Sequence, residues 1–121
     1  MSGRLLIAED EEAVRAFLVR GLVHAGYTVT AVADGQEALE VLDRGEPFDL
    51  LLTDIVMPRL DGIALALKAT QAYPAMKILM MTGYAAEQQR AYGMEALSHE
   101  VISKPFSLQK IISLVGSLID G

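Results

Sequence analysis

The sequence predicts an α/β fold in which a doubly wound sheet of parallel strands is covered by helices on both faces. Short, almost continuously apolar segments alternate along the chain with segments whose apolar residues recur at helical spacing. Strands that alternate with helices indicate parallel pairing, and strands that are apolar on both sides are typical of a sheet buried on both faces. Because crossover connections are right-handed, only a few doubly wound arrangements are compatible with this order.

The first half of the chain predicts three strands and two helices. The strands are expected at residues 4–9, 27–32 and 48–53. The first helix is expected at residues 12–25, and Gly26 closes it because glycine readily takes up the conformation that ends many helices. A second helix follows the turn at Asp34 and Gly35 and stops at residues 45–47, which contain a glycine and a proline.

The second half predicts two strands and three helices. The strands are expected at residues 77–81 and 101–103. A helix at residues 62–72 runs up to Pro74, and a helix at residues 86–95 is expected although it has few large apolar anchors. The last helix, at residues 108–119, carries its apolar residues on one stripe with a period of about 3.6 residues.

Composition restricts the class of protein. The chain has 121 residues, enough for a single domain spanning residues 1–121, and 52% of them are hydrophobic, which excludes intrinsic disorder. No apolar run approaches the roughly 20 residues needed to cross a bilayer, and the N-terminus does not read as a signal peptide. The absence of cysteine excludes disulfides, thiol catalysis and thiolate metal sites, and fits a cytoplasmic location. A net charge of −6 with scattered basic residues argues against binding to nucleic acid or to a membrane surface.

Polar and charged residues stand where the apolar strands end. Glu9 and Asp10 end the first strand, Asp54 the third, Thr82 the fourth and Lys104 the fifth. Each carboxylate taken alone could be a turn or helix-cap residue. Lys104, however, lies between a buried strand and a proline, where an ammonium group needs a nearby anion. Since the carboxyl ends of parallel strands meet at one edge of a sheet, the five side chains together predict a site for a divalent cation and a phosphoryl group.

Other short motifs that would indicate an enzyme site are absent. The sequence has no glycine-rich dinucleotide motif, P-loop, zinc-protease motif or nucleophile elbow. His24 and His99 have no metal-ligand partner at a useful spacing, and the adjacent residues 98–100 (Ser, His, Glu) do not obtain the geometry of a catalytic triad from adjacency alone. Both histidines are therefore expected to be structural or exposed.

Five segments of the chain form one pattern: Glu9-Asp10, residues 51–58 around Asp54, Asp61-Gly62, Thr82 and Lys104-Pro105-Phe106. In this pattern the chain resembles the receiver domain of bacterial two-component response regulators over essentially its whole length. The resemblance implies a flavodoxin-like sheet of five parallel strands in the order 2-1-3-4-5. More narrowly, the chain is similar to stand-alone cell-cycle receivers without an output domain, of the CpdR type, through Glu9-Asp10, residues 50–58 and Thr82-Gly83.

The resemblance implies a role for each residue that contacts the phosphoryl group. Asp54 would accept a phosphoryl group from a phosphohistidine on a sensor histidine kinase or a histidine phosphotransferase. Carboxylate nucleophiles of this kind are chemically reasonable. Lys104 would neutralise one phosphoryl oxygen, and the hydroxyl of Thr82 would bond to another.

The resemblance also implies Mg²⁺ as the cofactor. Asp10, Asp54 and the backbone carbonyl of Val56 would ligate the ion directly, and Glu9 would act through water. Mg²⁺ prefers octahedral oxygen coordination and keeps several waters, so one or two carboxylates suffice.

The phosphoryl group is expected to switch the binding of a downstream protein, since the chain ends at Gly121 directly after its last helix. The narrower resemblance suggests a cytoplasmic cell-cycle adaptor, monomeric or weakly dimeric, whose target could be a protease or its substrate. A phosphate shuttle and a receiver cut from a hybrid kinase remain open as alternatives. An Mg²⁺-dependent aspartyl-phosphate phosphatase is a remote alternative, because Val56 stands where such enzymes carry an acid–base aspartate. The expected chemistry is thus limited to self-phosphotransfer and autodephosphorylation, and the chain is not expected to be an enzyme.

One position departs from the family pattern. Many receivers carry an aromatic switch residue three positions before the lysine, where this chain has Val101. We expect Tyr84, two positions after Thr82, either to replace that aromatic residue as a reporter of the phosphorylated state or simply to shield the site.

Overall fold

The computed structural model describes residues 2–83 and 100–120. Its five strands are β1 (Arg4–Ala8), β2 (Thr28–Val32), β3 (Leu50–Asp54), β4 (Lys77–Thr82) and β5 (Glu100–Ser103). Its helices over the described residues are α1 (Glu12–His24), α2 (Gly35–Asp43), α3 (Gly62–Ala72) and α5 (Leu108–Asp120). The helix expected at residues 86–95 lies outside the described part of the chain.

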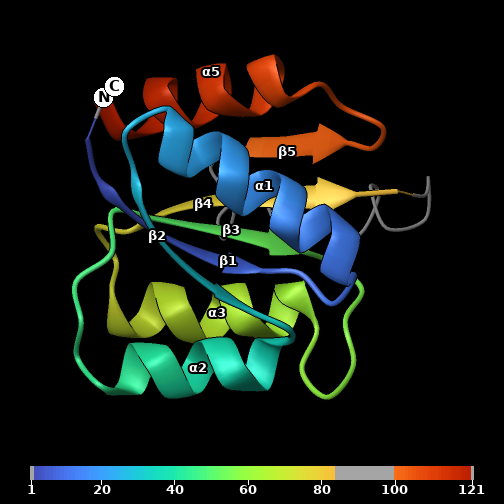
Figure 1. The fold of residues 1–121 in the computed structure, drawn as a ribbon. Coiled ribbons are helices and arrows are strands. Elements are labelled where there is room, and N and C mark those ends of the chain that lie inside the picture. Colours follow the sequence, from blue (N-terminus) through green and yellow to red (C-terminus); the bar gives the residue numbers. More distant parts are fainter. Residues whose placement is uncertain (1, 84–99, 121) are drawn as a thin grey trace.

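The strands form one parallel sheet in the order β2-β1-β3-β4-β5. Helices α1 and α5 cover one face of this sheet, and α2 and α3 cover the other (Figure 1). The predicted doubly wound α/β fold and its strand order are therefore confirmed. No helix in the described residues is long and apolar enough to span a membrane.

The core consists of two apolar layers, one on each face of the sheet. Successive strand residues point to opposite faces, so Leu6 and Leu51 pack toward α2 and α3, whereas Leu5 and Leu52 pack toward α1 and α5. All four of these leucines are fully buried. Apolar side chains that recur at helical spacing, such as Leu18 and Leu22 of α1 or Ile111 and Val115 of α5, complete the second layer. Burial on both faces explains why the strands read as continuous apolar runs.

Side chains cap the first turns of α2 and α3, the two helices on one face of the sheet. Asp34 accepts a hydrogen bond from the backbone N–H of Glu37 (2.8 Å) at the start of α2, and the Glu37 carboxylate accepts one from the N–H of Ala33 (2.9 Å). This pattern resembles a capping box, except that Glu37 binds the N–H of the residue before the N-cap rather than that of the N-cap itself. Asp61 caps α3 in a simpler way, by accepting from the N–H of Ala64 (2.9 Å). Both caps lie beside the strand ends, so they also determine how the loops reach the site.

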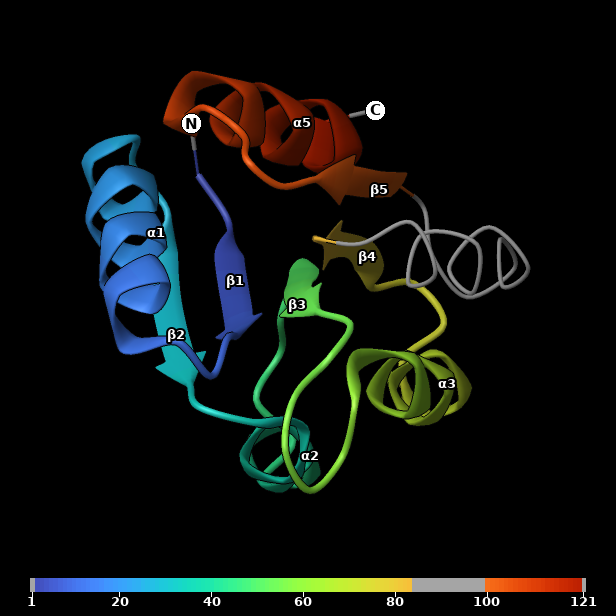
Figure 2. The same ribbon diagram turned by 90° about the vertical axis from the view of Figure 1, so that its right-hand side faces the viewer.

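The strand register brings the carboxyl ends of the strands level with one another. Ala8 of β1 pairs with Thr53 of β3, and Thr82 of β4 pairs with Ser103 of β5. Figure 2 faces this end of the sheet, toward which the strand arrows of Figure 1 point. The strand boundaries differ slightly from those expected, because Asp54 is the last residue of β3 and Glu9 lies just beyond β1.

Candidate functional site

Three carboxylates meet at the carboxyl end of the sheet. One oxygen atom from each of Glu9, Asp10 and Asp54 lies within 4.8 Å of the other two. Glu9 and Asp54 are buried, whereas Asp10 is exposed. The spacing arises because β1 and β3 are neighbours in the sheet, so the residues that end them lie side by side. Hard oxygen donors in this number and spacing match the preferences of Mg²⁺.

A single ammonium group faces the two buried carboxylates. The Nζ of Lys104 lies 3.0 Å from Oδ2 of Asp54 and 3.2 Å from Oε1 of Glu9. Lys104 directly follows β5, and its backbone N–H donates to the carbonyl of Thr82 (2.7 Å). It precedes a cis peptide bond to Pro105. The anion that the sequence requires for Lys104 is therefore a pair of carboxylates from two other strand ends.

Further hydrogen bonds orient the acids. Oδ1 of Asp54 accepts from the N–H of Ile55 (3.0 Å), and Oε2 of Glu9 accepts from the N–H of Glu11 (3.0 Å). The guanidinium of Arg15, on α1, donates to the backbone carbonyl of Glu9 (2.8 Å). Each buried carboxylate thus has one oxygen held by the backbone and the other held by Lys104. Arg15 was not predicted as a site residue; the signal in the sequence is an arginine that follows four consecutive acids at the start of a helix.

Burial makes the negative charge of this cluster costly. It raises the pKa of Asp54 and of Glu9 above their ordinary values, even though the hydrogen bonds and charge of Lys104 act in the opposite direction. Burial also acts to lower the pKa of Lys104, but the two carboxylates outweigh it and raise that pKa overall. The lysine is therefore held in its charged form, and the carboxylates have more negative charge than it can neutralise. Such a cluster favours an additional cation.

A close backbone contact fixes the position of Asp54. A Cβ atom added at Gly62, the first residue of α3, would collide with the backbone carbonyl of Asp54. The N–H of Gly62 donates to the carbonyl of Ile55 (2.8 Å). Only glycine allows α3 to start this close to the end of β3, which gives the expected Asp61-Gly62 pair a physical reason.

The structure brings together most of the residues predicted from the sequence. Glu9, Asp10, Asp54 and Lys104 converge as described. Thr82 is buried at the end of β4, next to the strand that leads to Lys104. The roles of Thr82 toward a phosphoryl oxygen and of the Val56 carbonyl toward a metal stay predictions.

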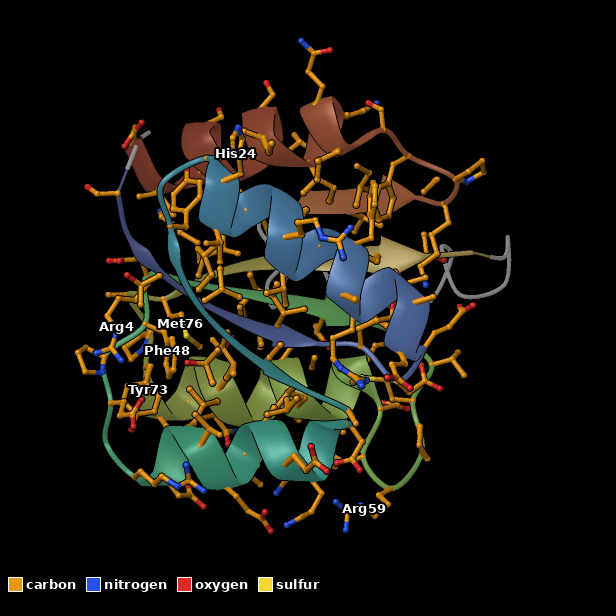
Figure 3. All side chains as sticks on the ribbon, viewed as in Figure 1. Arg4, His24, Phe48, Arg59, Tyr73 and Met76 are labelled. Atoms are coloured by element: carbon orange, nitrogen blue, oxygen red, sulfur yellow. The ribbon has the colours of Figure 1, made fainter. Side chains whose placement is uncertain are left out.

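Of the other residues singled out in the sequence, the structure describes Val101 and His24 but not Tyr84 or His99. Val101 is half-buried and packs against the apolar layer beneath α2 and α3. Tyr84 lies outside the described residues, as does His99, so the hypothesis about Tyr84 stays a prediction. His24 is exposed at the end of α1, on the side of the molecule away from the carboxyl ends of the strands (Figure 3).

Comparison with known proteins gives a consistent result. The family model of the response regulator receiver domain matches residues 5–116. The response regulator receiver protein CpdR of Brucella abortus is 44% identical over 116 residues, which cover 96% of this chain and 96% of that protein. The response regulator MprA of Mycobacterium ulcerans is 35% identical over 98% of this chain, which spans about half (51%) of that longer protein.

Solved structures agree with these matches. A CheY-like receiver domain protein from Methanospirillum hungatei superposes with a TM-score of 0.90 at 30% identity, covering 99% of this chain and 95% of the other. The response regulator TrrA from Thermotoga maritima, solved in complex with Mg²⁺ and BeF, has a TM-score of 0.85 at 27% identity, with 95% and 97% of the two chains covered.

Proposed function

This chain belongs to the receiver domains of two-component response regulators, and we propose that it accepts a phosphoryl group on Asp54 and thereby switches its binding to a protein partner. The observation that carries the proposal is the shared contact of Lys104 with Asp54 and Glu9 beside an exposed third carboxylate, Asp10. A site built only for stability would not place this excess of negative charge in a buried position.

Asp54 is the nucleophile of the proposed reaction. A carboxylate oxygen attacks the phosphorus of a phosphohistidine, a new P–O bond forms, the P–N bond breaks, and the imidazole nitrogen leaves with the electron pair. Oδ1 is held by the N–H of Ile55 and Oδ2 by Lys104, so the side chain is oriented before the donor arrives. The product is an acyl phosphate on Asp54.

The donor set fits Mg²⁺, because three carboxylate oxygens gather there and a single lysine does not balance their charge. Asp10, Asp54 and the carbonyl of Val56 would hold the ion, with Glu9 acting through water. When bound, Mg²⁺ supplies positive charge that offsets the repulsion between the carboxylates and the incoming phosphoryl group.

Lys104 and Thr82 stabilise the phosphoryl group in this proposal. The ammonium of Lys104 already contacts the oxygen of Asp54 that faces it, so a small movement brings it to a phosphoryl oxygen. The hydroxyl of Thr82 bonds to a second oxygen. The Lys104 N–H is bonded to the Thr82 carbonyl, so the ends of β4 and β5 are linked. In this proposal the two ends move together between an unphosphorylated and a phosphorylated state.

Receiver domains interact with histidine kinases or phosphotransferases and with downstream targets. For this chain we infer a sensor histidine kinase or histidine phosphotransferase as donor and a protein as the output partner, such as a protease or its substrate, in the cytoplasm. Its chemistry in this role is limited to taking up and losing its own phosphoryl group.

The test is intact-mass measurement after incubation with acetyl phosphate and Mg²⁺. Wild-type protein is expected to gain the mass of one phosphoryl group, and the gain should disappear with EDTA. Asp54→Ala should show no gain, whereas Asp43→Ala, which removes an exposed aspartate at the end of α2, should be labelled like wild type. Labelling of Asp54→Ala, or no labelling of wild type, would refute the proposal.

A further inference from the structure

An arginine in the loop between β3 and α3 holds that loop against the start of α2. The Nε of Arg59 lies 2.9 Å from Oδ2 of Asp34, and its Nη2 lies 3.2 Å from Oδ1 of the same carboxylate. Two parallel bonds of this kind form a fork that restricts direction as well as distance. In Figure 3, Arg59 lies near the start of α2, on the side of the molecule toward which the strands point.

The backbone of Arg59 is held in an unfavourable conformation. Arg59 has a φ of 69°, in the left-handed region that residues other than glycine and asparagine seldom adopt. Over the described residues it is the one position other than glycine with such a φ. With its backbone in this unfavourable conformation, Arg59 directs its guanidinium toward Asp34.

Asp34 is itself held firmly. Its side chain caps α2 through the N–H of Glu37 (2.8 Å), and it is almost completely buried although it is charged. The hydrogen bond from Arg59 lowers the pKa of Asp34 below its ordinary value, so the carboxylate stays ionised. The loop is therefore anchored to a rigid helix start rather than to a mobile surface group.

A second contact supports the same anchor. A Cβ atom added at Gly35, the first residue of α2, would collide with the backbone carbonyl of Leu60, the residue after Arg59. The loop thus touches α2 through the Arg59 side chain and through the Leu60 backbone. At its other end it continues from Asp54 through Ile55 to Val56, whose carbonyl is the ligand inferred for Mg²⁺.

We propose that Arg59 is a positioning residue that, by binding Asp34, holds the β3–α3 loop and with it Val56, whose carbonyl is the inferred ligand, and thereby sets the affinity of the site for Mg²⁺. This inference rests on the proposed function, since it assumes that the cluster binds Mg²⁺. Arg59 lies only three residues after Val56, so rotation of the loop about its start would move that carbonyl directly. Groups that orient metal ligands commonly change metal affinity by one to two orders of magnitude.

The test is isothermal titration of unphosphorylated protein with MgCl₂. Arg59→Ala should raise the dissociation constant for Mg²⁺ about tenfold, which means weaker binding. Asp34→Asn should do the same, because asparagine keeps the oxygen that caps α2 but loses the charge that binds the guanidinium. Arg59→Ala also removes the longer contact of Arg59 with Glu37 (3.9 Å), which Asp34→Asn leaves in place. The double variant should therefore bind Mg²⁺ no more weakly than Arg59→Ala alone, because that variant already lacks the Arg59–Asp34 bonds. Arg59→Lys, which keeps the charge but not the fork, should give an intermediate affinity.

Controls separate positioning from simple loss of structure. Arg44→Ala removes an exposed arginine just after α2, which forms no side-chain bond with any residue in the described ranges, and it should bind Mg²⁺ like wild type. Thermal unfolding without Mg²⁺ checks that each variant is folded. If Arg59→Ala does not fold, the Mg²⁺ affinities of Arg59→Lys and Asp34→Asn still test whether the Arg59–Asp34 contact matters. An unchanged dissociation constant in the folded variants, or additive losses in the double variant, would overturn the inference. If the inference about Arg59 fails but the wild-type protein binds Mg²⁺ and is labelled on Asp54, the proposed function still stands. If the wild-type protein does not bind Mg²⁺, both the proposed function and the inference about Arg59 are refuted.

Discussion

The two ends of the sheet place charged residues in opposite surroundings. At the amino end, the guanidinium of Arg4 lies over the ring of Phe48, 5.4 Å from its centroid, and contacts Glu46 at 3.3 Å, with both charged side chains about two-fifths exposed (Figure 3). At the carboxyl end, Lys104 is shared by two acids, of which Glu9 has no exposed side-chain surface. One end has paired charges in contact with water, and the other has an unequal set of buried charges.

The charges at the carboxyl end of the sheet lower the stability of the fold, whereas those at the amino end do not. Exposed pairs such as Arg4 and Glu46 contribute at most about 1 kcal/mol and cost little to keep. Buried carboxylates that share one lysine are unfavourable until a further cation arrives, as the raised pKa values of Glu9 and Asp54 indicate. The carboxyl end is therefore adapted to bind a ligand, and the amino end to maintain the fold.

The largest difference is expected from the same glycine-to-alanine change at each end. Gly62→Ala drives a Cβ into the carbonyl of Asp54 and should lower the free energy of unfolding by about 3 kcal/mol. Gly45→Ala, in the loop before β3, meets no atom within 4 Å and should cost only about 1 kcal/mol for its positive φ. Urea unfolding measures both values, and equal losses would contradict the role of Gly62.

The second-largest difference is expected when a positively charged side chain is removed at each end of the sheet. In EDTA, Lys104→Met leaves two buried carboxylates without their partner and should cost about 2 kcal/mol, somewhat less than for a fully buried pair because the lysine is partly exposed. Arg4→Met should cost about 0.5 kcal/mol. Added Mg²⁺ should recover stability in Lys104→Met but not in Arg4→Met. A Lys104→Met protein as stable as wild type in EDTA would show that the cluster is not under electrostatic strain.

A smaller effect separates stability from function at the amino end. The hydroxyl of Tyr73 donates to the backbone carbonyl of Leu42 (2.7 Å). Tyr73→Phe removes this bond and should lower the free energy of unfolding by about 1 kcal/mol. Labelling of Asp54 by acetyl phosphate should be unchanged, and a loss of labelling would mean that the two ends are coupled.

The smallest effect is expected for the ion pair of Asp34 and depends on pH. Because Arg59 lowers the pKa of Asp34 in the folded protein, the pair contributes stability above the pKa that this aspartate has when unfolded. That contribution is lost as pH falls through the lowered, folded pKa. Asp34→Asn should therefore cost about 0.5 kcal/mol at neutral pH and nothing in strong acid. A constant difference between the two proteins across acid titration would contradict this account of the pair.

The sequence sufficed to predict the sheet and most of the site for one physical reason. Parallel strands bring their carboxyl ends together, so acids and a lysine at three strand ends must converge once the strand order is known. Glu9 and Lys104 are 95 residues apart in the chain and still form the expected contact. Of the polar residues at the strand ends, Lys104 is the one whose position, between a buried strand and a proline, requires an anion by itself. The site is predicted from the combination of all five residues.

Other contacts could not be predicted, because they depend on loop conformation rather than on strand order. The fork between Arg59 and Asp34 requires a left-handed φ at an arginine, which residue propensity disfavours. The contact of Arg15 with the Glu9 carbonyl depends on the rotation of α1 about its axis. Strand ends also shifted by a residue at Glu9 and Asp54, since apolar pattern alone does not show where ladder hydrogen bonds stop.

The most direct test of the central claim is to locate the modified residue. After incubation with acetyl phosphate and Mg²⁺, borohydride reduces an aspartyl phosphate to homoserine, which peptide mass spectrometry can place in the chain. We predict homoserine at position 54 alone, and none when Mg²⁺ is replaced by EDTA. Homoserine at Asp10 or elsewhere, or at position 54 to an equal extent without Mg²⁺, would contradict a metal-dependent phosphoacceptor at the end of β3.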